Sequence, residues 1–104
     1  LNEHYQSPKD CERIKIWIPV ETEFNKNGLL VEKNSQKRKD IKWSGELRDG
    51  ITKPVLEMKK DDLNLELINI APCEAIIFHD KLLHAGMKNV GQYCRISLEF
   101  TVFV

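Results

Sequence analysis

The sequence predicts an all-β domain, arranged as an antiparallel sandwich or barrel. Apolar and polar residues alternate in several short segments, which is the pattern of half-buried strands. Turn-forming residues separate these segments, and no stretch has the apolar spacing of an amphipathic helix. At 104 residues the chain has the length of one small domain, residues 1–104.

The first half of the chain contains two predicted strands. Residues 13–20 alternate, and Pro19 indicates the end or an edge of that strand. Residues 25–28 contain Asn-Gly, a strong hairpin signal, so we expect residues 29–32 to form the partner strand. Residues 33–50 are polar and charged, and we interpret their basic run as a solvated loop rather than a phosphate or nucleic-acid patch.

The second half is predicted to alternate turns and strands. The predicted turns lie at residues 58–62, 71–74 and 89–92. The predicted strands lie at residues 63–70, 75–79 and 93–104, and the second of these is expected to be buried. The last strand has one continuous apolar face, formed by Cys94, Ile96, Leu98, Phe100, Val102 and Val104. That face is expected to pack against a second layer or a partner.

The opposite face of the last strand contains the candidate site. Arg95 and Ser97 point to the same side of an alternating strand, where a guanidinium and a hydroxyl suit a carboxylate. His84 lies 11 positions upstream across a turn, and its imidazole is a candidate metal ligand. The simpler alternative is that Arg95 and Ser97 face solvent, as polar residues of a sandwich strand do.

Further matches surround these residues. Trp17-Ile18-Pro19 is followed by Asn27-Gly28-Leu29 and, later, by Ser35. In type, order and spacing, these segments together with His84, Arg95 and Ser97 resemble the C-terminal half of an Fe(II)/2-oxoglutarate-dependent dioxygenase of the phytanoyl-CoA dioxygenase-like type. Of that family's Pro-Gly-Ser-His motif, Ser35 alone is present here.

The resemblance implies a fold, cofactors and an activity. The fold would be a double-stranded β-helix, a cupin-like jelly roll, and an incomplete one, since six or seven strands are predicted instead of eight. The cofactors would be Fe(II), bound by His84, and 2-oxoglutarate, whose far carboxylate Arg95 and Ser97 would hold. The activity would be hydroxylation of an unidentified small-molecule substrate, coupled to oxidative decarboxylation of 2-oxoglutarate to succinate and carbon dioxide.

The family's early His-x-Asp or His-x-Glu motif does not occur in this sequence. Two histidines and one carboxylate form the iron-binding facial triad. The one early histidine, His4, is followed two positions later by the amide Gln6. Ser7-Pro8 matches a step that follows the motif in relatives, so we expect a fragment whose first metal ligands lie just before Leu1 and which is inactive alone. We interpret His79 and Asp80 as residues that orient a turn rather than ligands.

A second function class stays open at this point. The chain could be a metal-free jelly-roll module that binds a small anion or another protein chain. Because an incomplete sheet has open edges, the sequence also predicts a homodimer formed through those edges.

Composition excludes some partners. The 16 basic and 16 acidic residues cancel, so no net charge favours nucleic acid or an anionic membrane. The apolar runs are too short to span a bilayer. Cys11, Cys73 and Cys94 are odd in number and lack metal-site spacing, which predicts reduced, mostly buried thiols and a cytoplasmic location.

Overall fold

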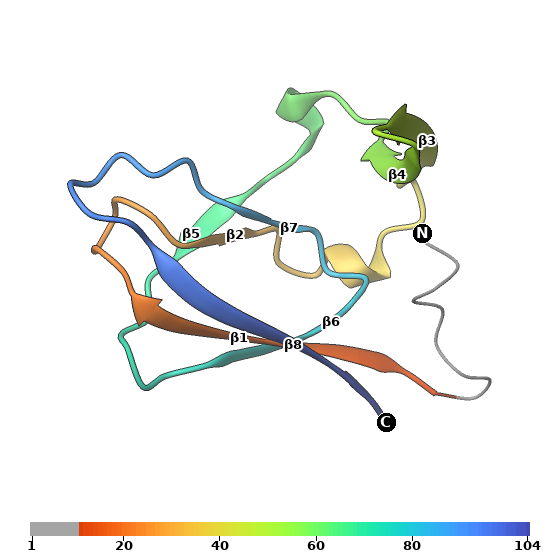
Figure 1. Ribbon diagram of the computed structural model, residues 1–104. Helices are drawn as coiled ribbons and strands as arrows, with labels where there is room; N and C mark the ends of the chain where they lie inside the picture. Colours follow the sequence, from red (N-terminus) through yellow and green to blue (C-terminus); the bar gives the residue numbers. More distant parts are fainter. Residues whose placement is uncertain (1–10) are drawn as a thin grey trace.

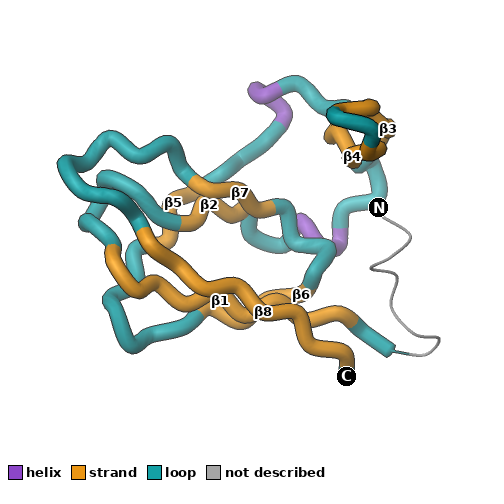
Figure 2. The backbone as a smooth tube through the Cα atoms, viewed as in Figure 1, coloured by secondary structure: helices purple, strands orange, loops and turns teal. Residues whose placement is uncertain are grey.

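The computed structural model describes residues 11–104, and strands make up its regular structure apart from two single-turn 3-10 helices (Figures 1 and 2). The strands are antiparallel, which confirms the predicted all-β class. The eight strands are β1 Arg13–Glu21, β2 Leu29–Val31, β3 Trp43–Arg48, β4 Ile51–Leu56, β5 Glu66–Ile68, β6 Ile76–His79, β7 His84–Gly86 and β8 Ile96–Phe103. The helical turns are η2 Ser35–Lys37 and η3 Lys60–Asp62.

Two three-stranded sheets face each other and form the body of the protein. Their strand orders are β6-β1-β8 and β5-β2-β7. In Figure 1 the first sheet lies below the second, and each is assembled from strands far apart in the sequence. Such non-local pairing is fixed by tertiary packing rather than by short-range turns.

The core lies between these two sheets. Trp17 from β1 and Phe78 from β6 pack against Leu29 and Val31 from β2, and all four are buried. The strand alternation explains the choice: these positions share the inward phase of their strands, as the register of β1 with β6 places Phe78 opposite Lys15. Burial of large apolar side chains here is the main stabilising contact between the sheets.

The opposite face of the β6-β1-β8 sheet is apolar and largely uncovered. We call it the outer face; its residues are Ile14, Ile16, Ile18, Ile77, Leu98, Phe100 and Val102, which the strand registers place side by side. Ile77 is 68% exposed and Phe100 is 50% exposed. The predicted burial of residues 75–79 is therefore wrong except at Phe78, because the β6 strand covers the core with one face only.

The predicted hairpin between the first two strands is also wrong. β2 pairs with β5 and β7, whereas β1 pairs with β6 and β8. The turn itself is present, with Asn25 and Gly28 at positive φ, but Asn27 uses its side chain for hydrogen bonds instead of forming a two-residue hairpin loop. Pro19 lies beyond the part of β1 that pairs with β6, next to a register shift against β8, as its missing N–H requires.

A separate hairpin begins within the polar, charged residues 33–50, for which no strand was predicted. β3 and β4 pair only with each other among the described strands and stand apart from the two sheets (Figure 1). The turn is Asp49-Gly50, both at positive φ, which is the strongest local hairpin signal. The sequence contains that signal, and the predominance of charged residues around it obscured the strands.

The three cysteines are free thiols, as predicted, but their predicted burial is wrong. Cys11 is half-buried, whereas Cys73 and Cys94 are exposed because they lie in a turn and in the segment before β8. None of the helical segments in residues 11–104 is long and apolar enough to cross a membrane.

Candidate functional site

The candidate site lies on the inner face of the β5-β2-β7 sheet. In β7, His84 is opposite Val31 and Gly86 is opposite Leu29. Since Val31 and Leu29 are core residues, His84 and Gly86 also face the interior, toward the β6-β1-β8 sheet. The short strand β7 therefore turns its polar imidazole inward.

Hydrogen bonding determines the tautomer of His84. Its Nδ1 lies 2.7 Å from the carbonyl oxygen of Leu82. A carbonyl only accepts, so Nδ1 carries the proton and Nε2 of the neutral ring has a free lone pair. The ring packs edge-on against Phe78, with centroids 4.8 Å apart, which restricts its rotation. An imidazole held in this way has the form of a metal ligand.

Arg95 reaches the same interior from the segment just before β8. Its guanidinium lies over the Trp17 ring, 5.9 Å from Cζ to the ring centroid. One terminal nitrogen donates to the Gly28 carbonyl at 3.3 Å. A Cβ added at Gly86 would lie 3.4 Å from both terminal nitrogens, at the limit of ordinary van der Waals contact, so the guanidinium packs closely against the backbone of β7. No carboxylate of residues 11–104 forms an ion pair with Arg95.

These contacts place His84 and Arg95 beside each other on one inner surface. The guanidinium packs against Gly86, which is two residues from His84 on the same face of β7. Residues two apart on a strand are separated by about 6.6 Å. Ser97 lies opposite Pro19 in β8 and faces the same interior, half-buried. Arg95 and Ser97 therefore face the interior and not solvent, in contrast to the simpler alternative considered from the sequence.

A network of amides holds the Arg95 segment in place, and no pattern in the sequence indicates it. Asn27 is 2% exposed; its Oδ1 accepts from Thr22 Oγ1 and from the Glu23 N–H, and its Nδ2 donates to Asn89 Oδ1 at 3.2 Å. Asn89 in turn donates to the Tyr93 carbonyl at 2.7 Å. The network connects the loop after β1 to the loop before Arg95, two segments more than 60 positions apart.

Ser35 fixes the segment before His84. It is 1% exposed, and its Oγ accepts a hydrogen bond of 2.7 Å from the Leu83 N–H. The Leu83 carbonyl accepts from the Glu32 N–H at 3.0 Å. The first residue of η2 therefore determines where β7 begins.

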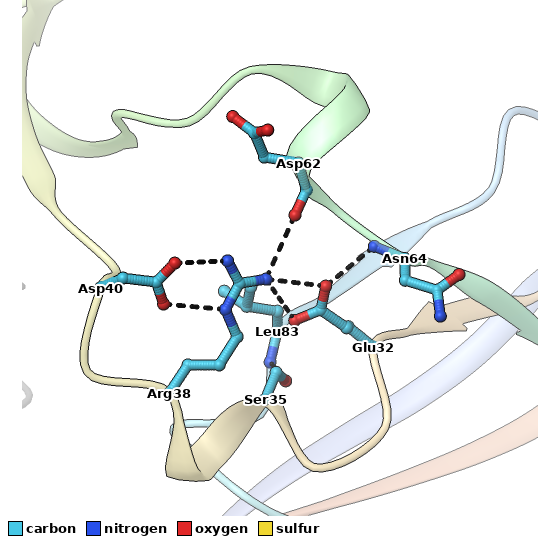
Figure 3. Close-up of polar contacts among 7 residues, drawn as sticks. All are labelled: Glu32, Ser35, Arg38, Asp40, Asp62, Asn64 and Leu83. Atoms are coloured by element: carbon cyan, nitrogen blue, oxygen red, sulfur yellow. Dashed lines mark hydrogen bonds and ion pairs between the residues drawn. The ribbon is translucent and has the colours of Figure 1, made fainter.

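An ion-pair cluster supports η2 from the other side (Figure 3). Arg38 donates to both oxygens of Glu32, at 2.9 and 2.8 Å, and grips Asp40 with two further bonds of 2.9 and 2.7 Å. The Asn64 N–H also donates to Glu32. Arg38 and then Asn64 lower the pKa of the Glu32 carboxyl, and Arg38 lowers the pKa of Asp40. Arg38 thus has an internal role within the basic run that we predicted to be a solvated loop.

His79 and Asp80 have other partners. The Lys81 N–H donates to His79 Nδ1 at 3.0 Å, so Nε2 carries the proton and donates to Glu12 at 2.7 Å. This bond lowers the pKa of Glu12. Asp80 lies 3.6 Å from Arg13 and 3.9 Å from Lys15. His79 bonds the backbone of the turn between β6 and β7, as we predicted, whereas the Asp80 carboxylate pairs with side chains of β1.

Arg95 and His84 each have hydrogen-bonding or ligand capacity that the described residues do not use. The guanidinium of Arg95 has donors that no described residue uses, and it lies beside an imidazole with a free lone pair. Residues 11–104 contain no group of three His, Cys, Asp or Glu side chains arranged to hold a metal. His4 and Gln6, and the Ser7-Pro8 step, lie outside the described residues.

Comparison with known proteins adds no relative: no family model, no curated protein and no solved structure matches this chain.

Proposed function

We propose that this chain is an Fe(II)/2-oxoglutarate-dependent oxygenase-type domain with an incomplete jelly-roll fold. The observation that carries the proposal is the placement of Arg95 against Gly86, two residues along β7 from an inward-facing imidazole whose Nδ1 is bonded to the Leu82 carbonyl. A guanidinium and a metal-ligand histidine on one interior surface suit a dicarboxylate that contacts both.

In this proposal each side chain has a distinct role. Arg95 binds the far carboxylate of 2-oxoglutarate, and the Ser97 hydroxyl donates to the same group. Trp17 holds the guanidinium plane, which lowers the entropy lost when the carboxylate binds. His84 supplies one metal ligand, with its orientation fixed by Leu82. The remaining ligands of a facial triad have to come from outside residues 11–104. Bound iron would supply the oxygen chemistry that protein side chains lack.

The test is calorimetric titration with 2-oxoglutarate, with and without Fe(II) under anaerobic conditions. Arg95→Ala should weaken binding of 2-oxoglutarate roughly 10- to 150-fold, the value of about 1.5–3 kcal/mol for a charge-assisted contact. Arg48→Ala, which removes an exposed guanidinium on the separate hairpin, should leave binding unchanged. Titration with 2-oxobutyrate, which lacks the far carboxylate, should not respond to Arg95→Ala.

A second variant keeps the test valid if Arg95→Ala folds poorly. Gly86→Val leaves Arg95 in the chain but places a side chain where the guanidinium lies, so it should weaken 2-oxoglutarate binding in the same direction. His84→Ala should remove any Fe(II)-dependent part of the binding and spare the rest. Unchanged 2-oxoglutarate affinity in both Arg95→Ala and Gly86→Val would reject the proposal.

One observation favours the second function class, a metal-free module that binds a small anion or a protein chain. The outer face is a continuous exposed apolar surface, and surfaces of this kind mark protein contacts. The homodimer predicted from open sheet edges belongs to this alternative, since β8 is both an edge strand and part of the outer face. Absence of 2-oxoglutarate binding together with concentration-dependent dimerisation would favour it.

A further inference from the structure

A cavity of about 550 Å³ lies beside His84. It is lined by β1, the region of η2, the β3–β4 hairpin and the turn before β7. His84 is part of its wall, but Arg95 and Ser97 are not. Its volume is within the range of small-molecule sites, about 300–1,000 Å³. The cavity is therefore separate from the proposed carboxylate clamp, and binding in it does not depend on the proposed function.

Arg13 and Asp80 bring a guanidinium and a carboxylate to this lining, and neither side chain forms a hydrogen bond within residues 11–104. A terminal nitrogen of Arg13 lies 3.6 Å from Asp80, which is longer than a hydrogen bond. Both side chains keep accessible surface, with 11% and 17% of it exposed. In Arg13, Nε is the polar atom sealed from that surface, so the terminal nitrogens are the donors that a ligand can reach. A donor and an acceptor of opposite charge are thus both available to a molecule in the cavity.

The backbone holds these two groups in place. The Asp80 N–H donates to the Arg13 carbonyl at 3.0 Å, and the strand β6, which ends just before Asp80, pairs with β1. The turn after Asp80 is closed by the N–H groups of Lys81 and Leu82, which donate to Nδ1 and the carbonyl of His79. A pair of groups that is already ordered loses less entropy when a ligand binds.

The charges around this pair limit the net charge of a ligand. Lys15 lies 3.9 Å from Asp80 and 3.3 Å from Glu99, so two positive and two negative groups meet at this part of the lining. Arg38 is occupied by the ion-pair cluster of Figure 3, and Lys81 is exposed, where solvent and salt screen its charge. A simple anion would be repelled by Asp80, and a simple cation would be repelled by the guanidinium. A ligand with one group of each sign satisfies both.

The remaining wall indicates an apolar body. Its residues are Ile41, Trp43, Pro54, Leu82 and Leu83. Trp43 is 56% exposed, although it is the largest apolar side chain of the lining. An apolar group that packs against its ring would be removed from water together with the ring.

We propose that the cavity binds an amino acid with an apolar side chain, in its zwitterionic form. The carboxylate accepts from the terminal nitrogens of Arg13, the ammonium group donates to Asp80, and the apolar side chain packs against Trp43. The two charged groups of an α-amino acid are attached to one carbon, so they can reach two protein groups that lie 3.6 Å apart.

Three matched probes test the proposal by calorimetry and by protein amide NMR shifts. They are phenylalanine, with both charged groups; 3-phenylpropionate, which lacks the ammonium group; and 2-phenylethylamine, which lacks the carboxylate. Phenylalanine should bind about tenfold or more tightly than either of the others, the value of one charge-assisted hydrogen bond. Tighter binding of the uncharged 3-phenylpropionamide than of phenylalanine would overturn the zwitterion assignment.

Two variants assign the charged groups. Asp80→Asn should weaken phenylalanine and 2-phenylethylamine about tenfold and leave 3-phenylpropionate at least as tight as in the wild type. Arg13→Gln should weaken phenylalanine and 3-phenylpropionate and spare 2-phenylethylamine. Trp43→Ala leaves the ion pair intact and changes an exposed residue, so it keeps the test valid if the charge variants fold poorly. It should weaken all three probes by a similar factor.

Control variants separate this site from the clamp. Asp49→Asn makes the same chemical change as Asp80→Asn at an exposed turn position outside the cavity, and Leu47→Ala changes an exposed apolar residue of the same hairpin. Both should leave phenylalanine binding unchanged. Arg95→Ala should weaken 2-oxoglutarate and spare phenylalanine, whereas Asp80→Asn should do the reverse. The Asp80 effect without any binding of 2-oxoglutarate would reject the proposed function and support this site.

Two results would overturn the amino-acid site. The first is the failure of both phenylalanine and leucine to bind the wild-type chain. The second is phenylalanine binding that stays unchanged in both Asp80→Asn and Trp43→Ala.

Discussion

The inner face of the β6-β1-β8 sheet combines core and charged residues, whereas its outer face is apolar. The inner face presents Arg13 and Lys15 in the same row as the buried Trp17. It borders a cavity beside His84 at one end and contacts the Arg95 guanidinium at Trp17. The outer face is entirely apolar along β1, yet it is partly open to solvent, with Phe100 50% exposed. Antiparallel sheets usually turn their apolar side to the core and their polar side to water.

The two faces of β1 are therefore under different structural requirements. On the inner side of β1, Trp17 packs in the core and Arg13 forms an ion pair with Asp80. A charge in the interior requires such a partner or a bound ligand. The outer isoleucines Ile14, Ile16 and Ile18 have no layer above them within residues 11–104, so their stabilising burial has to come from further contacts. We therefore expect substitutions on the inner face to change stability and ligand binding, and substitutions on the outer face to change self-association.

The largest effect should come from the core of the inner face. Trp17→Ala removes the largest of the four buried core side chains and the support of Arg95, and should lower the free energy of unfolding by about 3–5 kcal/mol. Denaturant unfolding measures this change. A loss below about 1 kcal/mol would show that the contact between the sheets is not the main source of stability.

A smaller effect is expected at the amide network beside the clamp. Asn27→Ala leaves the Glu23 N–H and Asn89 without their partner, and should cost about 1–3 kcal/mol. Asn64→Ala is the matched control, since Asn64 is exposed and uses its backbone N–H for its bond to Glu32. Equal unfolding free energies for the two variants would contradict the role assigned to Asn27.

Acid should lower the stability of the fold by protonating the carboxylates of the ion-pair cluster in Figure 3. Arg38 holds the pKa of Glu32 below its ordinary value of 4.5, so the stabilisation is complete above that value and is lost as the pH falls through the lower folded pKa. Glu32→Gln should flatten the acid side of a melting-temperature profile against pH. Glu46→Gln, at an exposed ion pair of the hairpin, should keep the wild-type slope, and a similar flattening there would contradict the assignment.

The smallest effect on folding should come from the outer face. Phe100→Thr replaces one strand-favouring residue in β8 by another, the β-branched threonine, and should change the free energy of unfolding by less than about 1 kcal/mol. It should nevertheless reduce any self-association seen in sedimentation equilibrium. Phe24→Thr removes a phenylalanine that is 75% exposed from a loop outside this face and should leave association unchanged. The reverse pattern would place the contact elsewhere.

Alternation was sufficient to predict the long strands but not their partners. β1 and β8 were predicted within a few residues because their apolar phase is strong over nine and eight residues. Pairing depends on contacts between distant segments, so Asn27-Gly28 suggested a false hairpin while Asp49-Gly50, inside a charged region, formed a real one. Local turn chemistry shows where the chain bends, and only the packed core determines which strands meet.

The candidate site shows a similar division. His84, Arg95 and Ser97 were selected from residue type and spacing, and the structure turns all three to the interior. The residues that hold them, Asn27 and Ser35, could not be identified, because an amide or hydroxyl that bonds a distant backbone looks in sequence like any loop residue. The cavity beside His84 is lined by β1, the region of η2, the β3–β4 hairpin and the turn before β7. Because these segments are far apart in the sequence, no local sequence pattern predicts the cavity.

The β3–β4 hairpin forms one wall of the cavity beside His84, and we expect this wall to be less stable than the β1 wall. An isolated pair of strands is marginally stable in water, and Trp43 and Leu47 of this hairpin are exposed. Its amides should therefore exchange with deuterium through local opening, well before those of β1. A molecule bound between Trp43 and β1 would slow deuterium exchange in the hairpin selectively. Exchange of the hairpin amides would therefore measure whether the cavity is occupied.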